Sequence, residues 1–117
     1  MSSIKRILIV EDEPLISMML EDFVDALGHA LAGTADSLAD ALVFAGKGEF
    51  DIAILDVNLR GGEKSWPVAD LLAEAGKAFV LASGGSADST PDRHAQAPVL
   101  AKPFTMDAVR IALARFD

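Results

Sequence analysis

Polar residues that could carry out chemistry follow four short apolar segments of the chain, directly where each segment ends. They are Glu11-Asp12 after residues 7–10, Asp56 after 52–55, Ser83 after 79–82 and Lys102-Pro103 after 99–101. The first three segments are continuous apolar runs, which is typical of parallel strands covered on both faces. The carboxyl ends of parallel strands lie at one edge of the sheet, where ligands bind in such folds. We therefore expect these polar side chains to meet at that edge.

This combination of side chains suits phosphoryl chemistry with a metal. Carboxylates gathered in an apolar protein need a positive partner, and a divalent cation is the simplest one. Asp12 and Asp56 offer only oxygen ligands, with no His or Cys nearby, and this favours Mg²⁺. An Asp beside Mg²⁺ can also act as a nucleophile toward phosphorus, while a lysine and a hydroxyl neutralise the phosphoryl oxygens. Asp56, Lys102 and Ser83 fit these three roles.

Helical patterns separate the apolar segments. Helices are predicted from Pro14 to Leu27, from Ser37 to about Gly46, from Pro67 to Ala75 and after Thr105, and residues 31–35 form a weaker strand. Residues 83–98 are polar and interrupted by glycine and proline, so they predict only a short or mobile fourth helix, with His94 at the surface. Five strands that alternate with five helical segments predict one parallel sheet with helices on both faces.

Length and charge restrict the possible functions. A chain of 117 residues has the length of one domain, so we expect residues 1–117 to form a single domain without an output domain. The net charge of −8 disfavours nucleic acid and anionic membranes as partners. The absence of cysteine excludes disulfides and thiolate catalysis. No signal peptide or transmembrane segment is visible, so we expect a cytoplasmic protein.

The order of the four motifs resembles that of the receiver domains of two-component response regulators. Such domains carry an acidic pair after the first strand, a phosphoacceptor aspartate after the third, Thr or Ser after the fourth and Lys-Pro after the fifth. The resemblance implies a (βα)₅ flavodoxin-like α/β fold with strand order 2-1-3-4-5. It also implies that a histidine kinase or a phosphotransfer protein donates a phosphoryl group to Asp56, and that the receiver promotes this transfer and its later hydrolysis.

Individual roles follow from the same resemblance. The implied Mg²⁺ ligands are Glu11, Asp12, Asp56 and the backbone carbonyl of Asn58. Ser83 would donate a hydrogen bond to a phosphoryl oxygen, and Lys102 would form an ion pair with it. Side chains two places beyond the acceptor and two beyond the hydroxyl, here Asn58 and Gly85, would tune hydrolysis.

The chain departs from the usual receiver pattern at two places. Val99 stands where most receivers carry an aromatic switch residue, three places before the lysine. Residues 59–67 replace the common Pro-Gly-x-Asp-Gly turn after the acceptor. Together with residues 79–85, this loop is similar to that of a subgroup of bacterial single-domain receivers with a Phe-Ala-Thr-Gly-Tyr-like fourth strand. Their partners are often histidine kinases of the HWE or a related class.

Three functions remain to be separated. The first is a phosphoryl-accepting signalling module, not a turnover enzyme, which binds a downstream protein or relays phosphate. The second is a small phosphohydrolase in which Asp56 is the nucleophile, although Asn58 cannot supply the general acid of an Asp-x-Asp motif and the length leaves no cap domain. The third is an interaction module that works without phosphorylation. The complete set of acceptor, metal-ligand, hydroxyl and lysine residues favours the first.

Overall fold

The computed structural model of the chain describes residues 4–83 and 90–116, which form one five-stranded parallel sheet. The strand order is β2-β1-β3-β4-β5, as the resemblance to receiver domains implies. The strands are β1 (Arg6–Val10), β2 (Ala30–Ala35), β3 (Ile52–Asp56), β4 (Ala78–Ser83) and β5 (Val99–Ala101). The helices are α1 (Pro14–Ala26), α2 (Leu38–Lys47), α3 (Trp66–Glu74) and α4 (Met106–Ala114), with 3₁₀ turns at Arg60–Gly62 and Asp92–His94.

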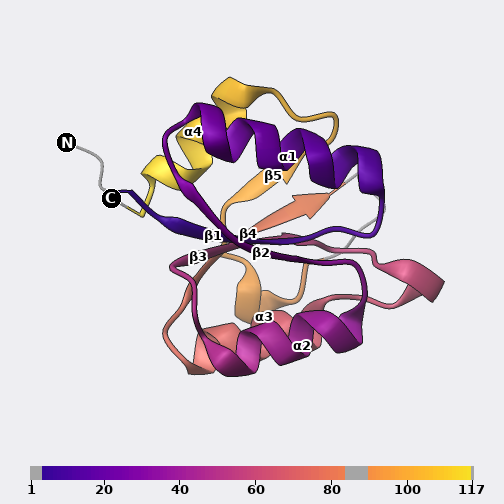
Figure 1. Cartoon of the computed structure of the whole chain (residues 1–117). Coiled ribbons are helices and arrows are strands. Elements are labelled where there is room, and N and C mark those ends of the chain that lie inside the picture. The colour runs from indigo at the N-terminus through magenta and orange to yellow at the C-terminus, as the bar shows by residue number, and fades with distance from the viewer. Residues whose placement is uncertain (1–3, 84–89, 117) are drawn as a thin grey trace.

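Helices cover both faces of the sheet, with α1 and α4 on one face and α2 and α3 on the other (Figure 1). Alternate residues of β1 point to opposite faces, so Ile7 and Ile9 pack with the α1 and α4 side while Leu8 and Val10 pack with the α2 and α3 side. Both sets are buried, which explains why the strand is apolar at every position rather than at every second one.

Local signals in the sequence set where the helices begin. Pro14 occupies the first position of α1, where its missing N–H costs nothing. The hydroxyl of Ser37 accepts a hydrogen bond from the Asp40 N–H at 3.2 Å, and the Thr105 hydroxyl accepts one from Ala108 at 3.1 Å. Within residues 4–83 and 90–116, no helix is long and apolar enough to cross a membrane.

Of the segment predicted to hold the fourth helix, residues 84–89 lie outside the described residues, and residues 90–98 contain a single 3₁₀ turn that His94 anchors. The His94 side chain is buried, so the expectation that it lies at the surface is wrong. Its ring stacks on Trp66, with centroids 6.0 Å apart and an interplanar angle of 17°, and meets Phe79 edge-on at 5.6 Å. Its Nε2 lies 2.7 Å from Oδ1 of Asp70 on α3. These contacts fix residues 92–94 against α3 and β4 without a full helix.

We expect His94→Ala to lower the free energy of unfolding by about 2–3 kcal/mol, because the substitution removes a buried ring from an aromatic cluster. Urea unfolding followed by circular dichroism measures this loss. Arg93→Ala is the matched control, because Arg93 is exposed and pairs with the same Asp70 carboxylate, 2.6 Å from Nε to Oδ1. If the arginine variant loses as much stability as the histidine variant, the anchor is the exposed ion pair and not the ring.

Candidate functional site

Three carboxyl groups gather where β1 and β3 end. Asp56 is the last residue of β3 and is 4% exposed, and Glu11, directly after β1, is 3% exposed. Asp12 is half-buried. Because β1 and β3 are neighbours in the sheet, one oxygen from each of the three side chains lies within 4.8 Å of the other two. The sequence predicts this cluster, and the described residues bring it together.

Lys102 supplies positive charge to the cluster. Its Nζ donates a hydrogen bond to Asp56 Oδ2 at 3.1 Å and lies 3.2 Å from Glu11 Oε1. Burial lowers the pKa of Lys102, but the hydrogen bond and the charges of Asp56 and Glu11 outweigh burial and raise the pKa above its usual value. The ammonium therefore stays charged, and one cation faces three carboxyl groups.

Glu11 shows that the charge of the cluster is not balanced. The pKa of Glu11 is raised to about 7, mainly by burial and further by the hydrogen bond and charge of Asp56, while the Glu13 N–H and Lys102 oppose the rise. The Glu13 N–H donates to Oε2 at 3.2 Å. Oε1 is buried and accepts no hydrogen bond from any described residue, although it is in ion-pair contact with Lys102. A buried carboxyl oxygen that accepts no hydrogen bond is a suitable ligand for a hard divalent cation.

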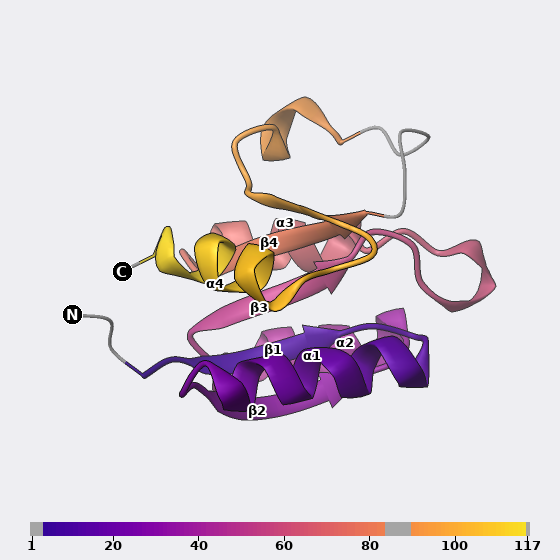
Figure 2. The same cartoon turned by 90° about the horizontal axis from the view of Figure 1, so that it is seen from above.

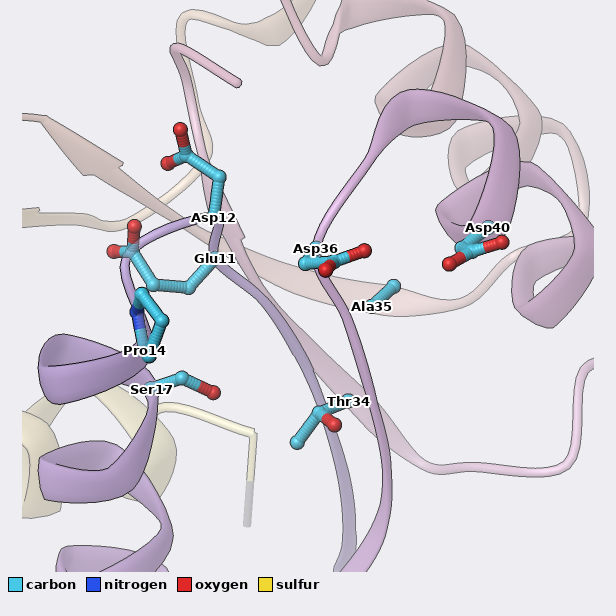
Figure 3. A pocket seen from close by; sticks show the side chains of 8 residues that line it. All are labelled: Glu11, Asp12, Pro14, Ser17, Thr34, Ala35, Asp36 and Asp40. Atoms are coloured by element: carbon cyan, nitrogen blue, oxygen red, sulfur yellow. The ribbon is translucent and has the colours of Figure 1, made fainter. Parts of the chain in front are cut away.

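A hollow of about 330 Å³ adjoins the cluster, between the start of α1 and the end of β2. Figure 3 shows its lining residues, which are Glu11, Asp12, Pro14, Ser17, Thr34, Ala35, Asp36 and Asp40. Four of the eight carry carboxyl groups, so the hollow attracts cations toward the cluster. Sequence reasoning missed Asp36 and Asp40 as members of this surface, because Asp40 has the pattern of a residue in a helix-capping turn.

The other predicted site residues lie at the same edge of the sheet. Ser83 ends β4, one residue beyond the Ala82 that pairs with Asp56, and its carbonyl accepts the Lys102 N–H at 3.0 Å. The backbone N–H of Asn58 donates to Asp56 Oδ1 at 3.2 Å. Val99 is exposed on the edge strand β5. Gly85, expected to influence hydrolysis, lies outside the described residues.

The loop after Asp56 is a small antiparallel hairpin, which the sequence did not predict. The Leu59 N–H donates to the Glu63 carbonyl at 2.7 Å, and the Ser65 N–H donates to the Val57 carbonyl at 3.0 Å. Gly61 and Gly62 form its turn with φ angles of 76° and 79°, which side chains rarely adopt. Figure 2 shows this loop projecting beyond the carboxyl ends of the strands.

Asn58 and Lys64 face each other across this hairpin. They form its antiparallel bridge, and Lys64 Nζ donates a hydrogen bond to Asn58 Oδ1. No sequence pattern predicts this pair, because glycine-rich loops have no fixed register until their hydrogen bonds form. The pair brings a second lysine to the residue that hydrogen-bonds Asp56.

Together these residues can bind a divalent cation and present one carboxylate oxygen to an electrophile. Asp56 is the residue so presented, since it is held between Lys102, the Asn58 N–H and the acidic pair. The oxygen-only donor set and the neighbouring lysine are suited to a phosphoryl group.

Comparison with known proteins agrees with this arrangement. The solution structure of SdrG from Sphingomonas melonis Fr1 has a TM-score of 0.86 and 59% sequence identity, covering 97% of both chains. A second solution structure, of the BeF3-activated conformation of SdrG from Pseudomonas melonis Fr1, has a TM-score of 0.81 and 58% identity, covering 99% of this chain and 98% of that one. The PhyR response regulator REC domain of Erythrobacter litoralis has a TM-score of 0.77 and 28% identity, covering 97% of this chain and 89% of that one.

A longer regulator is similar to the chain over part of its length. The phyllosphere-induced regulator PhyR of Methylorubrum extorquens is 34% identical over 102 residues, which cover 85% of this chain. The chain spans only 38% of the length of that regulator. No protein-family model matches the sequence.

Proposed function

This chain belongs to the receiver domains of response regulators, which are signalling proteins, and we propose that Asp56 is the residue on which it accepts a phosphoryl group. One observation carries the proposal. The Asp56 carboxylate ends β3, is nearly buried, and lies 3.1 Å from the Lys102 ammonium beside two further carboxyl groups. The BeF3-activated conformation known for SdrG supports it, since BeF3 is a mimic of a phosphoryl group.

The transfer needs three actions from the residues of this chain. An Asp56 carboxylate oxygen forms a bond to phosphorus while the bond from phosphorus to the donor breaks, and the leaving group keeps the electron pair. Lys102 neutralises negative charge on the phosphoryl oxygens as it now neutralises the carboxylate. Ser83, at the end of the neighbouring strand, donates its hydroxyl to another phosphoryl oxygen.

We propose that the cation at this site is Mg²⁺. Glu11, Asp12 and Asp56 would hold it through carboxylate oxygens, and Asn58 through its backbone carbonyl. When bound, Mg²⁺ neutralises negative charge on the acceptor and phosphoryl oxygens. The buried Glu11 oxygen without a hydrogen bond supports this assignment, because a hard cation satisfies it.

Proton competition at Glu11 gives the site a pH dependence. The pKa of Glu11 in the folded protein is about 7, so at a lower pH its carboxyl group carries a proton that the cation must displace. We expect the affinity for Mg²⁺ to fall about twentyfold between a pH of about 7.5 and about 5.5, measured by calorimetry. Glu11→Gln should bind more weakly but with little change over the same range. An affinity for the wild type that is flat or rises as the pH falls would contradict this role of Glu11.

The stability of the metal-free protein depends on pH in the opposite direction to the affinity for Mg²⁺. The unfolded chain releases the Glu11 proton near a pH of 4.5 and the folded protein near 7, so between these values the folded state binds more protons. Glu11 therefore makes the metal-free protein less stable as the pH rises through this range.

We propose that the phosphoryl donor is a histidine kinase of the HWE or a related class, or a phosphotransfer protein, and that the signal passes to a separate downstream protein. The outward face of α1 supports a protein donor. Leu15 is 81% exposed and Met18 is 59% exposed, and both lie in the first half of α1, next to the acidic cluster. An apolar surface beside the acceptor is suited to a protein that must bring a phosphohistidine to Asp56. The absence of cysteine is compatible with the cytoplasm, where such a kinase would act.

Incubation with Mg²⁺ and a small acyl phosphate tests the proposal. We expect intact-mass measurement to show one phosphoryl group per chain, stable in acid and labile in base, and absent when a chelator removes the metal. Sustained turnover of phosphomonoesters would favour the phosphohydrolase instead. If no adduct forms from the acyl phosphate or from a phosphorylated kinase, the interaction module without phosphorylation is the better account.

A further inference from the structure

We propose that Lys64 prolongs the life of the phosphoryl group on Asp56 by holding the carboxamide oxygen of Asn58 away from hydrolytic water. The inference rests on the proposed function, since it concerns how the adduct on Asp56 is lost. It assigns a positioning role to a residue outside the metal and acceptor set.

The backbone fixes Lys64 opposite Asn58. Hydrogen bonds from the Leu59 N–H to the Glu63 carbonyl and from the Ser65 N–H to the Val57 carbonyl flank the pair on both sides. The two residues form the antiparallel bridge between these bonds, so their side chains leave the hairpin on the same face. An exposed lysine is usually solvated and free to choose its partners. The register of the hairpin instead places Lys64 directly opposite Asn58.

Asn58 in turn is attached to the acceptor. Its backbone N–H donates to Asp56 Oδ1 at 3.2 Å, so its position is linked to that of the carboxylate that would carry the phosphoryl group. Its side chain is half-buried, while Lys64 is exposed. Asn58 is therefore joined to the acceptor through its backbone N–H and to Lys64 through its side chain, whose Oδ1 accepts a hydrogen bond from Lys64 Nζ.

Hydrolysis needs a water molecule that is oriented toward phosphorus. The water oxygen forms a bond to phosphorus as the bond between phosphorus and the Asp56 oxygen breaks. The carboxylate keeps the electron pair, and the water proton passes to the phosphate or to solvent. A carboxamide oxygen can orient such a water by accepting one of its hydrogens, as a glutamine does in GTPases. An ammonium is a stronger donor than water, so Lys64 competes for this oxygen and slows the reaction.

The test compares the decay of the adduct in five variants. Each is phosphorylated with Mg²⁺ and an acyl phosphate, desalted, and followed by intact mass over time. They are Lys64→Met, Lys64→Arg, Asn58→Ala, the double variant Lys64→Met with Asn58→Ala, and Lys47→Met. Lys47 is a matched control because it is an exposed lysine at the end of α2. It shortly precedes β3 and so lies near the amino-terminal ends of the strands, away from Asp56 at the carboxyl end of β3.

We expect Lys64→Met to shorten the half-life of the adduct about two- to tenfold, the ratio that corresponds to one hydrogen bond. Lys64→Arg and Lys47→Met should keep the half-life of the wild type, and the double variant should decay like Asn58→Ala alone. The rate of phosphorylation should not change in Lys64→Met, which separates this role from a general disturbance of the loop.

Two results would overturn the inference. An unchanged or longer half-life in Lys64→Met would show that Lys64 does not restrain hydrolysis. A shorter half-life that persists in the Asn58→Ala background would show that Lys64 acts without Asn58. In both cases the wild type is still phosphorylated and the proposed function stands, whereas a wild type that takes up no phosphoryl group overturns both.

Discussion

Asp56→Asn is expected to lose the phosphoryl adduct, with at least about a hundredfold less labelling than the wild type in Mg²⁺ and an acyl phosphate. An amide cannot form the acyl phosphate that a carboxylate forms, while its size is the same and its carbonyl can still accept the hydrogen bond from Lys102. The fold should therefore persist, and the loss of labelling should be chemical. Intact-mass measurement after equal incubation gives the comparison.

Asp51→Asn is the matched control for this substitution. Asp51 directly precedes β3, at the opposite end of the strand from Asp56, and its Oδ2 accepts the Arg6 N–H at 2.8 Å. Asparagine can keep that hydrogen bond, so this variant should be labelled like the wild type. Equal labelling of Asp56→Asn and the wild type would mean that another carboxylate is the acceptor.

Asp12→Ala should weaken Mg²⁺ binding at least about tenfold while the protein stays folded. Asp12 contributes one of the three carboxylates that lie within 4.8 Å of one another, and it is the least buried of them. Removing it deletes a metal ligand and relieves repulsion between like charges, so the metal-free fold should not lose stability. Calorimetric titration measures the affinity, and thermal unfolding without Mg²⁺ checks the fold.

Asp25→Ala serves as the control for Asp12→Ala, because it removes an exposed carboxylate at the far end of α1. Its Mg²⁺ affinity should equal that of the wild type. If Asp12→Ala also binds Mg²⁺ as the wild type does, the assigned coordination is wrong, and the cation would have to bind elsewhere along the acidic hollow.

The fold and the central site were predictable because their signals are local. Continuous apolar strands can only be covered on both faces, and the caps at Ser37 and Thr105 depend on residues three positions away. Glu11 and Asp56 lie close together simply because each follows or ends one of two neighbouring parallel strands. These features follow from sequence pattern and topology, without knowledge of individual side-chain contacts.

Other features depend on side-chain contacts that no local sequence pattern signals, and the sequence did not predict them. The burial of His94 results from Trp66, Asp70 and Phe79, which lie far from it in the chain. The pairing of Lys64 with Asn58 depends on a hairpin register that no local pattern signals. The contacts of His94 form only after the fold has brought these segments together, whereas the pairing of Lys64 with Asn58 needs only the hairpin to close in this register.

Site mapping tests the central claim most directly. Borohydride reduces an aspartyl phosphate to homoserine, so trapping the wild-type adduct and then sequencing its peptides by mass spectrometry locates the acceptor. We expect homoserine at position 56 alone, and only when Mg²⁺ is present during labelling. Homoserine at another position, or a phosphorylated protein without homoserine at position 56, would contradict the assignment of Asp56 as the phosphoacceptor.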